Sequence, residues 1–460
     1  MARLPETGAD RPQGARGGAG PGRRRRRGGK AVTCPRALLQ RLYATAVAAA
    51  QPATCLPAHL PAPPAQGRLV VLAAGKAAGS MAEVAERHYV GSGGLPGGRI
   101  TGLAVTRHGY GRPTRLIEVV EAGHPVPDAA GLAAAERTLA LADAATADDL
   151  VLVLLSGGAS ANWIAPAPGI ALDEKQAVTR ALLRSGAGIG EINTVRKHLS
   201  RIKGGRLAAR IYPARLITLA ISDVPGDDPS VIGSGPTVPD RTTLADARAV
   251  IARYRLAAPM SITRALADAA NETPKPGEAV FTAAEFRIVA RPADAFLAAE
   301  AAARAQGYDC VMLGDQLEGE ARQVAAEHAR LAREFLAGGR RVVMLSGGEL
   351  TVTIRGHGRG GPNQEYALAL AAGIDGAAGI SAIAGDTDGT DGGGGAADDP
   401  AGAFVDAATV GRARTLGLDP AGFLANNDST GFFARLGDLL RPGPTWTNVN
   451  DFRAILVDRI

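Results

Sequence analysis

Residues 151–155 are all apolar and lead directly into Ser156-Gly157-Gly158. A fully apolar run of this length predicts a strand that is covered on both faces, as in a parallel sheet flanked by helices. The two glycines allow a sharp turn, so that successive backbone N–H groups can converge on an anion at the entrance of a helix. A tight turn that binds nothing is the alternative interpretation.

The same pattern returns late in the chain, where residues 342–345 precede Ser346-Gly347-Gly348 and residues 350–354 alternate like a second strand. Two strands that end in the same turn predict two α/β units facing one polar ligand. We therefore expect the two Ser-Gly-Gly turns to form the two halves of a split anion site.

The remaining pattern alternates strands with helices. Strands are predicted at residues 69–72, 102–106, 116–121, 216–221, 310–313, 381–384 and 453–457, and helices at residues 37–50, 173–184, 244–255, 260–270, 294–306 and 320–337. A Pro- and Gly-rich link at residues 273–277 suggests a domain boundary, which divides the chain into residues 31–275 and 276–460.

Composition supports this interpretation. A chain of 460 residues is too long for one ordinary core, and 46% hydrophobic residues with only 4% aromatic ones suit a helix-rich α/β protein. The formal net charge is +6, but residues 1–30 carry nine Arg and Lys against two acidic residues. This segment is predicted to be a disordered basic tail. The rest of the chain is close to neutral, so no nucleic-acid partner is predicted.

Three cysteines, at positions 34, 55 and 310, form no metal or redox motif and fit a reducing compartment. No apolar run reaches the roughly 18 residues that span a bilayer, and no apolar segment follows the basic N-terminus as it would in a secretory signal. We expect a cytoplasmic protein with no membrane partner. A homodimer is one option, and the oligomeric state is left open.

Lys76 is the first candidate for catalysis. It follows Gly75 directly after the strand at residues 69–72, where a helix begins. A positive charge at the positive end of a helix is unfavourable unless an anion binds there. The spacing differs from that of a P-loop.

Carboxylates form the second group of candidates. Asp223 follows the strand at residues 216–221, at the edge where open α/β sheets bind ligands, and could serve as a base or as a metal partner. Asp386, Asp388 and Asp391 lie among glycines and could hold Mg²⁺ or Ca²⁺. The EF-hand pattern is incomplete there, so a loop that lines a charged cleft fits better.

A basic segment follows Glu191 and Asn193. It is predicted to form one helix face and contains Arg196, His198, Arg201, Lys203 and Arg206. Such a face is commonly only solvated, but its polar start and its Lys203-Gly204-Gly205 end favour a role in lining a cleft. His124, in a Pro-rich loop, is either catalytic or a hydrogen-bonded strut.

Taken together and in order, the motifs resemble the class II glycerate 2-kinases, which carry a C-terminal MOFRL domain and have often been labelled hydroxypyruvate reductases. The resemblance covers about residues 37–457 and rests on Gly75-Lys76-Ala77, Gly123-His124-Pro125, Ser156-Gly157-Gly158, residues 191–197, Ser222-Asp223-Val224, Gly233-Ser234-Gly235-Pro236, Ser346-Gly347-Gly348-Glu349, residues 360–365, residues 387–392 and residues 447–451.

This resemblance implies ATP-dependent phosphorylation of D-glycerate at the 2-hydroxyl, with Mg²⁺. It also implies an α/β fold with a larger Rossmann-like N-terminal domain, which has a parallel sheet, and a smaller C-terminal α/β domain, with the active site in the cleft between them. It makes Lys76 the essential lysine. An arginine of the family pattern falls on Pro362, so Arg359 or Arg196 is expected to supply that charge. Ala159 stands where the family has glycine.

The expected site follows from both arguments. Its catalytic residues are Lys76, Asp223 and Arg359; its substrate- or phosphate-binding residues are Ser156, Gly157, Gly158, Ser160, Glu191, Asn193, Arg196, Lys203, Ser346, Gly347, Gly348, Glu349 and Asn363; its metal ligands are Asp388 and Asp391. An NAD(P)-dependent hydroxypyruvate reductase is the alternative enzyme, but no Gly-x-Gly-x-x-Gly with a suitably placed acidic residue follows a strand. A sugar-acid binding protein without catalysis is the third interpretation.

Overall fold

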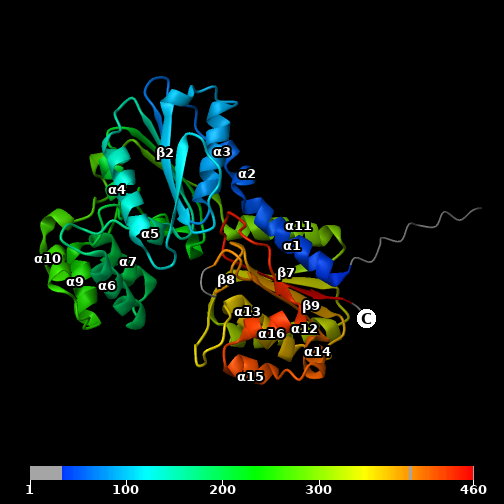
Figure 1. Ribbon diagram of the computed structural model, residues 1–460. Coiled ribbons are helices and arrows are strands. Elements are labelled where there is room, and N and C mark those ends of the chain that lie inside the picture. Colours follow the sequence, from blue (N-terminus) through cyan, green and yellow to red (C-terminus); the bar gives the residue numbers. More distant parts are fainter. Residues whose placement is uncertain (1–33, 393–395, 459–460) are drawn as a thin grey trace, which may run out of the picture. The chain divides into compact units, whose positions relative to one another are not determined.

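The computed structural model describes residues 34–392 and 396–458, in which the strands form two six-stranded sheets (Figure 1). The predicted basic tail, residues 1–30, lies outside the described residues. Both sheets belong to one unit, Pro35–Ile460. No helix in the described part of the chain has the length and apolar character needed to cross a membrane.

The first sheet is parallel throughout. Its strands, in spatial order, are β3 (Ile117–Ala122), β2 (Ile100–Arg107), β1 (Leu69–Ala74), β4 (Leu150–Leu155), β5 (Arg215–Ile221) and β6 (Ala284–Ala290). This is the order of a doubly wound Rossmann-like sheet, in which the direction of winding reverses between β1 and β4. Ligands bind at the carboxyl ends of the strands beside such a reversal.

Helices cover both faces of this sheet, as the apolar strands predicted. Every residue of β1 is buried: Leu69 and Val71 pack in the cluster that contains α3, while Val70 and Leu72 pack in the cluster that contains α4 and α8. These three helices are α3 (Ala78–Val90), α4 (Ala129–Asp143) and α8 (Arg206–Ile211).

We call each sheet, together with its helices, one half of the protein. In the half that contains the first sheet, four further helices share a separate apolar cluster. They are α6 (Leu172–Arg184), α7 (Ile189–His198), α9 (Leu244–Arg253) and α10 (Met260–Ala267). The short helix α5 (Ala159–Asn162) begins directly after the first Ser-Gly-Gly turn.

The second sheet is mixed. Its strands, in spatial order, are β11 (Leu439–Leu440), β10 (Gly402–Asp406), β9 (Ile380–Asp386), β12 (Asp451–Val457), β8 (Val342–Thr351) and β7 (Asp309–Glu320). Only β7 and β8 pair in parallel. The helices of this half are α11 (Pro292–Ala305), α12 (Ala321–Ala337), α13 (Pro362–Gly373), α14 (Thr409–Thr415), α15 (Pro420–Ala425) and α16 (Ser429–Leu436).

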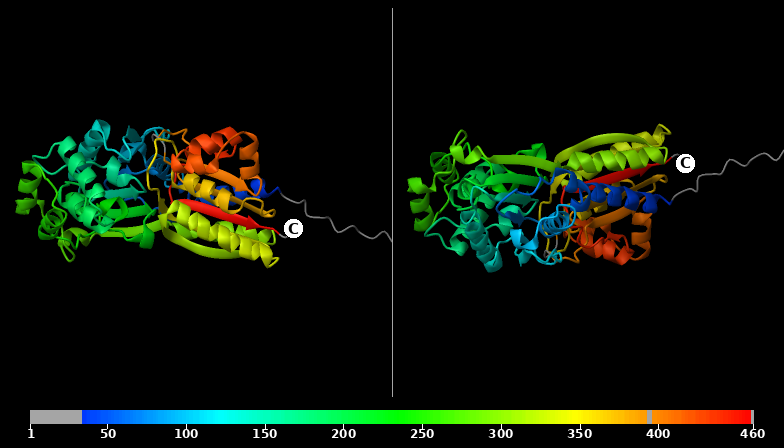
Figure 2. Two further views of the ribbon diagram at one scale, coloured as in Figure 1. Left: turned by 90° about the horizontal axis from the view of Figure 1, so that it is seen from below. Right: turned by 90° about the horizontal axis from the view of Figure 1, so that it is seen from above.

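Two segments cross the expected boundary at residue 275. Helix α1 (Pro35–Ala50), which α2 (Pro52–Cys55) follows, contacts α11, β9 and β12 of the second sheet, and Figure 2 shows it in blue beside the red β12. Strand β6, beyond residue 275, pairs with β5 of the first sheet. Each half of the protein therefore includes a segment from the other side of that position.

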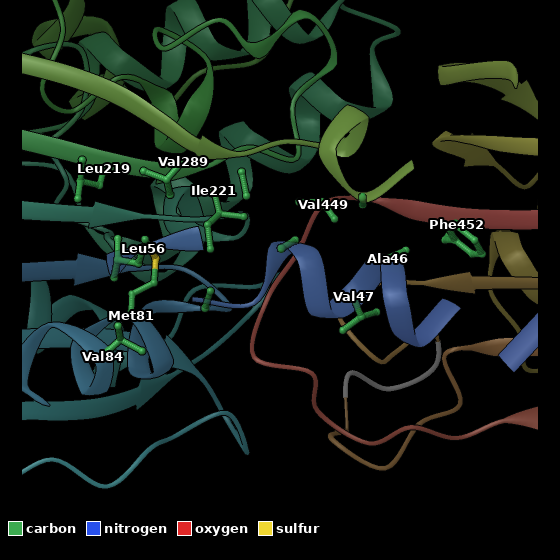
Figure 3. Packing of buried hydrophobic residues seen from close by; sticks show 14 of the residues in the cluster. Ala46, Val47, Leu56, Met81, Val84, Leu219, Ile221, Val289, Val449 and Phe452 are labelled. Carbon is green, nitrogen blue, oxygen red and sulfur yellow. The ribbon is translucent and has the colours of Figure 1, made fainter. Parts of the chain in front are cut away.

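One apolar cluster contains residues of both halves (Figure 3). It includes Leu219 and Ile221 of β5, Ala46 of α1 and Phe452 of β12, all of them buried. This shared core explains how the loops at the strand ends of the two sheets come into contact.

The predicted second turn at Ser346-Gly347-Gly348 is wrong. Strand β8 runs without interruption through these residues, because they pair with β12 on one side and with β7 on the other. The glycines are there for packing: a Cβ on Gly347 would lie 2.5 Å from the ring of Phe296, and one on Gly348 would lie 2.2 Å from the backbone of Leu317. The structure thus gives no second turn for a split anion site.

Candidate active site

The turns after β1 and β4 bind each other at the carboxyl edge of the first sheet. The backbone N–H of Lys76 donates to the carbonyl of Gly157 at 2.8 Å, and the N–H of Ala77 donates to Oγ of Ser156 at 2.9 Å. Gly75 has φ +118°, and a Cβ there would lie 2.3 Å from the Ser156 hydroxyl. Two segments flanking the winding reversal are thereby joined, with Lys76 at the junction.

The side chain of Lys76 crosses from the first half to the second. Its Nζ lies 2.6 Å from Oδ2 of Asp388, in the turn after β9, and both side chains are largely buried. Burial by itself lowers the pKa of Lys76, but the carboxylates of Asp388 and Asp386 outweigh it and raise that pKa well above its usual value. Lys76 is therefore a permanent positive charge.

Asp388 is held by groups from both halves. Its Oδ1 accepts from the backbone N–H of Thr390 at 2.7 Å, and its carbonyl accepts from the hydroxyl of Tyr110 at 2.9 Å. The guanidinium of Arg107, at the end of β2, lies 3.7 Å from its Oδ2 and donates to the Thr390 hydroxyl. Sequence reasoning missed Arg107 and Tyr110, since neither belongs to a motif.

Asp223, after β5, is fixed by the C-terminal loop. Its Oδ2 accepts from Nδ2 of Asn448 at 2.7 Å, and its carbonyl accepts from Nδ2 of Asn450 at 3.1 Å. Gly157 is packed against this pair, because a Cβ on it would lie 1.9 Å from the Asp223 carboxylate. Burial raises the pKa of Asp223, against the lowering effect of Lys76.

Glu349 brings another carboxylate close to this group. Its side chain is exposed at the end of β8, yet partial desolvation and the carboxylates of Asp223 and Asp451 raise its pKa. Asp386 is affected more strongly: burial and Asp388 raise its pKa well above the usual value. Burial and the repulsion between neighbouring carboxylates therefore both oppose the charged forms of these groups.

Asp391, predicted as a metal ligand, instead accepts hydrogen bonds from other residues of the protein. Its Oδ1 accepts from the backbone N–H of Asn363 at 3.0 Å and its Oδ2 from that of Gln364 at 2.8 Å, at the start of α13. Burial and the carboxylate of Asp451 raise its pKa to about 7. Asn363 also donates to Asp451, so both residues fasten the helix to the sheet.

Within the described residues, no three His, Cys, Asp or Glu side chains form a group that could hold a metal ion. Asp388 is paired with Lys76, and Asp391 caps α13. The structure thus does not bring the two expected metal ligands together at one ion.

The basic segment does not form one helix face. Helix α7 ends at His198, and Lys203 lies in the turn before α8. Arg196, Lys203 and Ser160 nevertheless line one cavity of about 350 Å³, together with Lys175 of α6, which the sequence reasoning did not single out. A lysine on the buried face of an amphipathic helix, in register with Val178 and Leu182, was the available signal.

The other polar residues of the expected set lie elsewhere. Glu191 caps α7 and accepts from Arg253 and from the Tyr254 hydroxyl, and neither Glu191 nor Asn193 lines the cavity. Arg359 is exposed and donates to Asp399 at 3.3 Å.

His124 lines the cavity and lies within electrostatic reach of Lys76. A Cβ on Gly158 would lie 3.1 Å from the His124 ring and 3.3 Å from Cγ of Lys76. Burial, together with the positive charges of Lys76 and Arg107, lowers the pKa of His124 to about 3. Its imidazole is therefore neutral at physiological pH, a state that fits both the catalytic and the strut interpretation.

Comparisons with known proteins identify the family of this chain. Residues 38–267 match the family described as a domain of unknown function (DUF4147), and residues 342–451 match the MOFRL family. A protein of Agrobacterium vitis named putative hydroxypyruvate reductase is 48% identical over 92% of this chain and 94% of its own. A D-glycerate 2-kinase of Thermotoga maritima is 39% identical over 84% of this chain and 89% of its own.

The fold agrees with these sequence matches. A crystal structure of a glycerate kinase from Thermotoga maritima superposes with a TM-score of 0.79 at 36% identity, covering 91% of this chain and 98% of that one. The chain belongs to the class II glycerate 2-kinase family, in which a DUF4147 domain is followed by a MOFRL domain.

Proposed function

We propose that the protein transfers the γ-phosphoryl group of ATP to the 2-hydroxyl of D-glycerate, giving 2-phosphoglycerate and ADP. Relatives named D-glycerate 2-kinase and glycerate kinase support this reaction. The observation that carries it is the buried Lys76–Asp388 pair beside the winding reversal, with Asp223 held close by.

Lys76 stabilises the phosphoryl group during transfer. Enzymes catalyse this reaction mainly by positioning the reactants and neutralising charge, and a fixed cation in a buried site does both. The turn after β1 fixes the lysine backbone through Gly157 and Ser156, and Asp388 fixes its ammonium group.

Asp223 accepts the proton of the attacking hydroxyl. The two other candidate carboxylates already have partners: Asp388 forms an ion pair with Lys76, and Asp391 accepts hydrogen bonds from the start of α13. Asp223 has one amide partner, Asn448, and its raised pKa favours proton acceptance.

Mg²⁺ would neutralise charge on the phosphates when bound. Enzymes of this kind hold it through one or two carboxylates plus phosphate oxygens and water, so a complete protein cage is not required. The crowded carboxylates fit a cation, and Glu349 is the exposed member of the group. We propose Glu349 as the residue that receives the metal.

A reductase is the competing activity, since two relatives carry the name putative hydroxypyruvate reductase. Such an enzyme needs a glycine-rich dinucleotide turn after the first strand. Here Lys76 occupies that turn and is paired with Asp388. The site geometry therefore favours phosphoryl transfer.

One pair of assays separates the two activities. Purified protein is incubated with D-glycerate and Mg²⁺-ATP while ADP release is followed, and in parallel with hydroxypyruvate and NADH while absorbance is followed. We expect ADP without NADH loss; NADH loss without ADP would overturn the proposal. NMR of the product then distinguishes 2- from 3-phosphoglycerate.

A further inference from the structure

The cavity between α6, α7 and the turn before α8 holds more positive charge than its surroundings balance. Four cationic residues line it, namely Lys175, Arg180, Arg196 and Lys203, and no Asp or Glu among the described residues does so. Lys175 and Lys203 are buried, and buried charges in proteins are normally paired, so this cluster calls for an anion.

The individual contacts strengthen that argument. Nζ of Lys175 donates to the carbonyl of Leu199, and Nζ of Lys203 donates to that of Ser160 at 2.7 Å. Arg196 is largely buried and has no hydrogen-bond or ion-pair partner within residues 34–392 and 396–458. Lys175, Arg196 and Lys203 thus line the cavity, and none of them forms an ion pair with an acidic side chain of the described residues.

Without a ligand, the surroundings disfavour the charged forms of these lysines. Burial, with Arg196 and Arg206 nearby, lowers the pKa of Lys175 to about 7, and burial with Lys175 and Arg196 lowers that of Lys203 well below the usual value. A polyanion in the cavity would reverse both shifts.

The other lining residues indicate the chemistry of the rest of the ligand. Val126 and Leu183 line the cavity although their side chains are 60% and 58% exposed, and Ile164 adds a third apolar surface. Gln176 and Thr179 supply hydrogen-bonding groups beside them. A cavity of about 350 Å³ is in the range of nucleotide-sized ligands and far larger than a three-carbon acid needs.

We propose that this cavity is the nucleotide site, which rests on the kinase function proposed above. The phosphate chain of ATP lies against Lys175, Arg196 and Lys203, and the base lies on the apolar wall of Val126 and Leu183. The cavity is lined by His124 and by Gly158, where a Cβ would lie 3.3 Å from Cγ of Lys76, so the terminal phosphate points toward that residue. Glycerate then binds on the opposite side of Lys76, toward Asp223.

Binding measured separately for each substrate tests this assignment. The β,γ-imido analogue of ATP with Mg²⁺, and D-glycerate alone, are titrated calorimetrically into wild type, R196M, K175M and K175R. We expect R196M and K175M to weaken analogue binding about 10- to 100-fold, as loss of a charged hydrogen bond does, and K175R to restore much of it. Glycerate binding should stay within twofold.

Arg210→Met is the matched control, because Arg210 of α8 is a cation of the same half that pairs with Asp143 away from the cavity. Weakened glycerate binding with unchanged analogue binding would overturn the assignment and make the cavity the carboxylate site. Unchanged binding of both would show that the cations are structural.

A second measurement uses unaltered protein. Pyridoxal 5′-phosphate at pH 8 condenses with a neutral lysine amine, releasing water, and borohydride reduces the imine to a stable product that peptide mass spectrometry locates. We expect Lys175 to be labelled, and ATP but not D-glycerate to protect it. Protection by glycerate alone, or labelling unaffected by ATP, would contradict the proposal. Absence of ADP formation by wild type would instead refute the kinase function, whatever the binding results.

Discussion

The ammonium group of Lys76, after β1 of the first sheet, lies 2.6 Å from a carboxylate oxygen of Asp388, after β9 of the second. Burial of both side chains makes the pair mutually dependent, because removing either partner leaves a buried charge without compensation. The proposed catalytic lysine therefore also contributes a contact between the two halves.

Replacing Lys76 separates these two roles. K76M should lower kcat by at least 10²- to 10³-fold, since it removes a cation aimed at the transition state, and should destabilise the fold by about 3 kcal/mol. The double variant K76M/D388N should recover much of the stability and none of the activity. Steady-state kinetics and urea unfolding measure both effects. Near-normal kcat in K76M would refute the central role of this lysine.

Asp223→Asn should lower kcat about 10²- to 10⁴-fold while the KM for each substrate changes little, because the amide keeps the shape of the side chain but accepts no proton. Asp228→Asn, in the same loop, is the control, since within the described residues the Asp228 carboxylate accepts only from the backbone N–H of Ser230. If D223N and D228N have equal kcat, another group takes the proton.

The lowered pKa of Lys175 predicts that the stability of the protein depends on pH. Its pKa is about 7 in the folded protein and 10.5 when unperturbed, so between these values the unfolded chain binds a proton that the folded protein does not. The free energy of unfolding of wild type, relative to K175M, should therefore rise with pH from 7 to 9.5, by up to about 3 kcal/mol at 1.36 kcal/mol per pH unit. Below pH 7 the difference should be constant.

Urea unfolding of the two proteins at pH 6, 7.5 and 9.5 checks this slope. Taking the difference removes the contributions of titrating groups that behave alike in both proteins, and the lost hydrogen bond to Leu199 adds an offset but no slope. A difference that stays constant or falls over this pH range would show that Lys175 stays charged in the folded protein.

Gly348→Ala tests the function of the second Ser-Gly-Gly. Gly348 has φ +100°, and a Cβ would overlap the backbone of Leu317 in β7, so the variant should be destabilised by several kcal/mol. Gly411→Ala, in α14 with open space around it, should be neutral or slightly stabilising, by about 0.5–1 kcal/mol. Unchanged stability of G348A with a raised KM would restore the anion-turn interpretation.

The pattern of burial was readable from the sequence because it is local. Apolar residues at 69–72 and 151–155 predicted strands covered on both faces, and β1 and β4 are buried at every position. The ordered motifs also predicted the family and the α/β architecture, which the family matches and the parallel Rossmann-like sheet confirm. The placement of Lys76 in a turn at the edge of the sheet followed from the same local signals.

Only the tertiary structure decided which charges meet. Ser346-Gly347-Gly348 has the same letters as the first turn, but neighbouring strands on both sides keep it extended, and pairing partners are not encoded in a short segment. In the same way, packing between distant elements brings Asp388 to Lys76, occupies Asp391 with α13, and gathers Lys175, Arg196 and Lys203 around one cavity. A sequence specifies the residue types available for a site, whereas the packing of its elements determines the distances and burial on which the electrostatics depend.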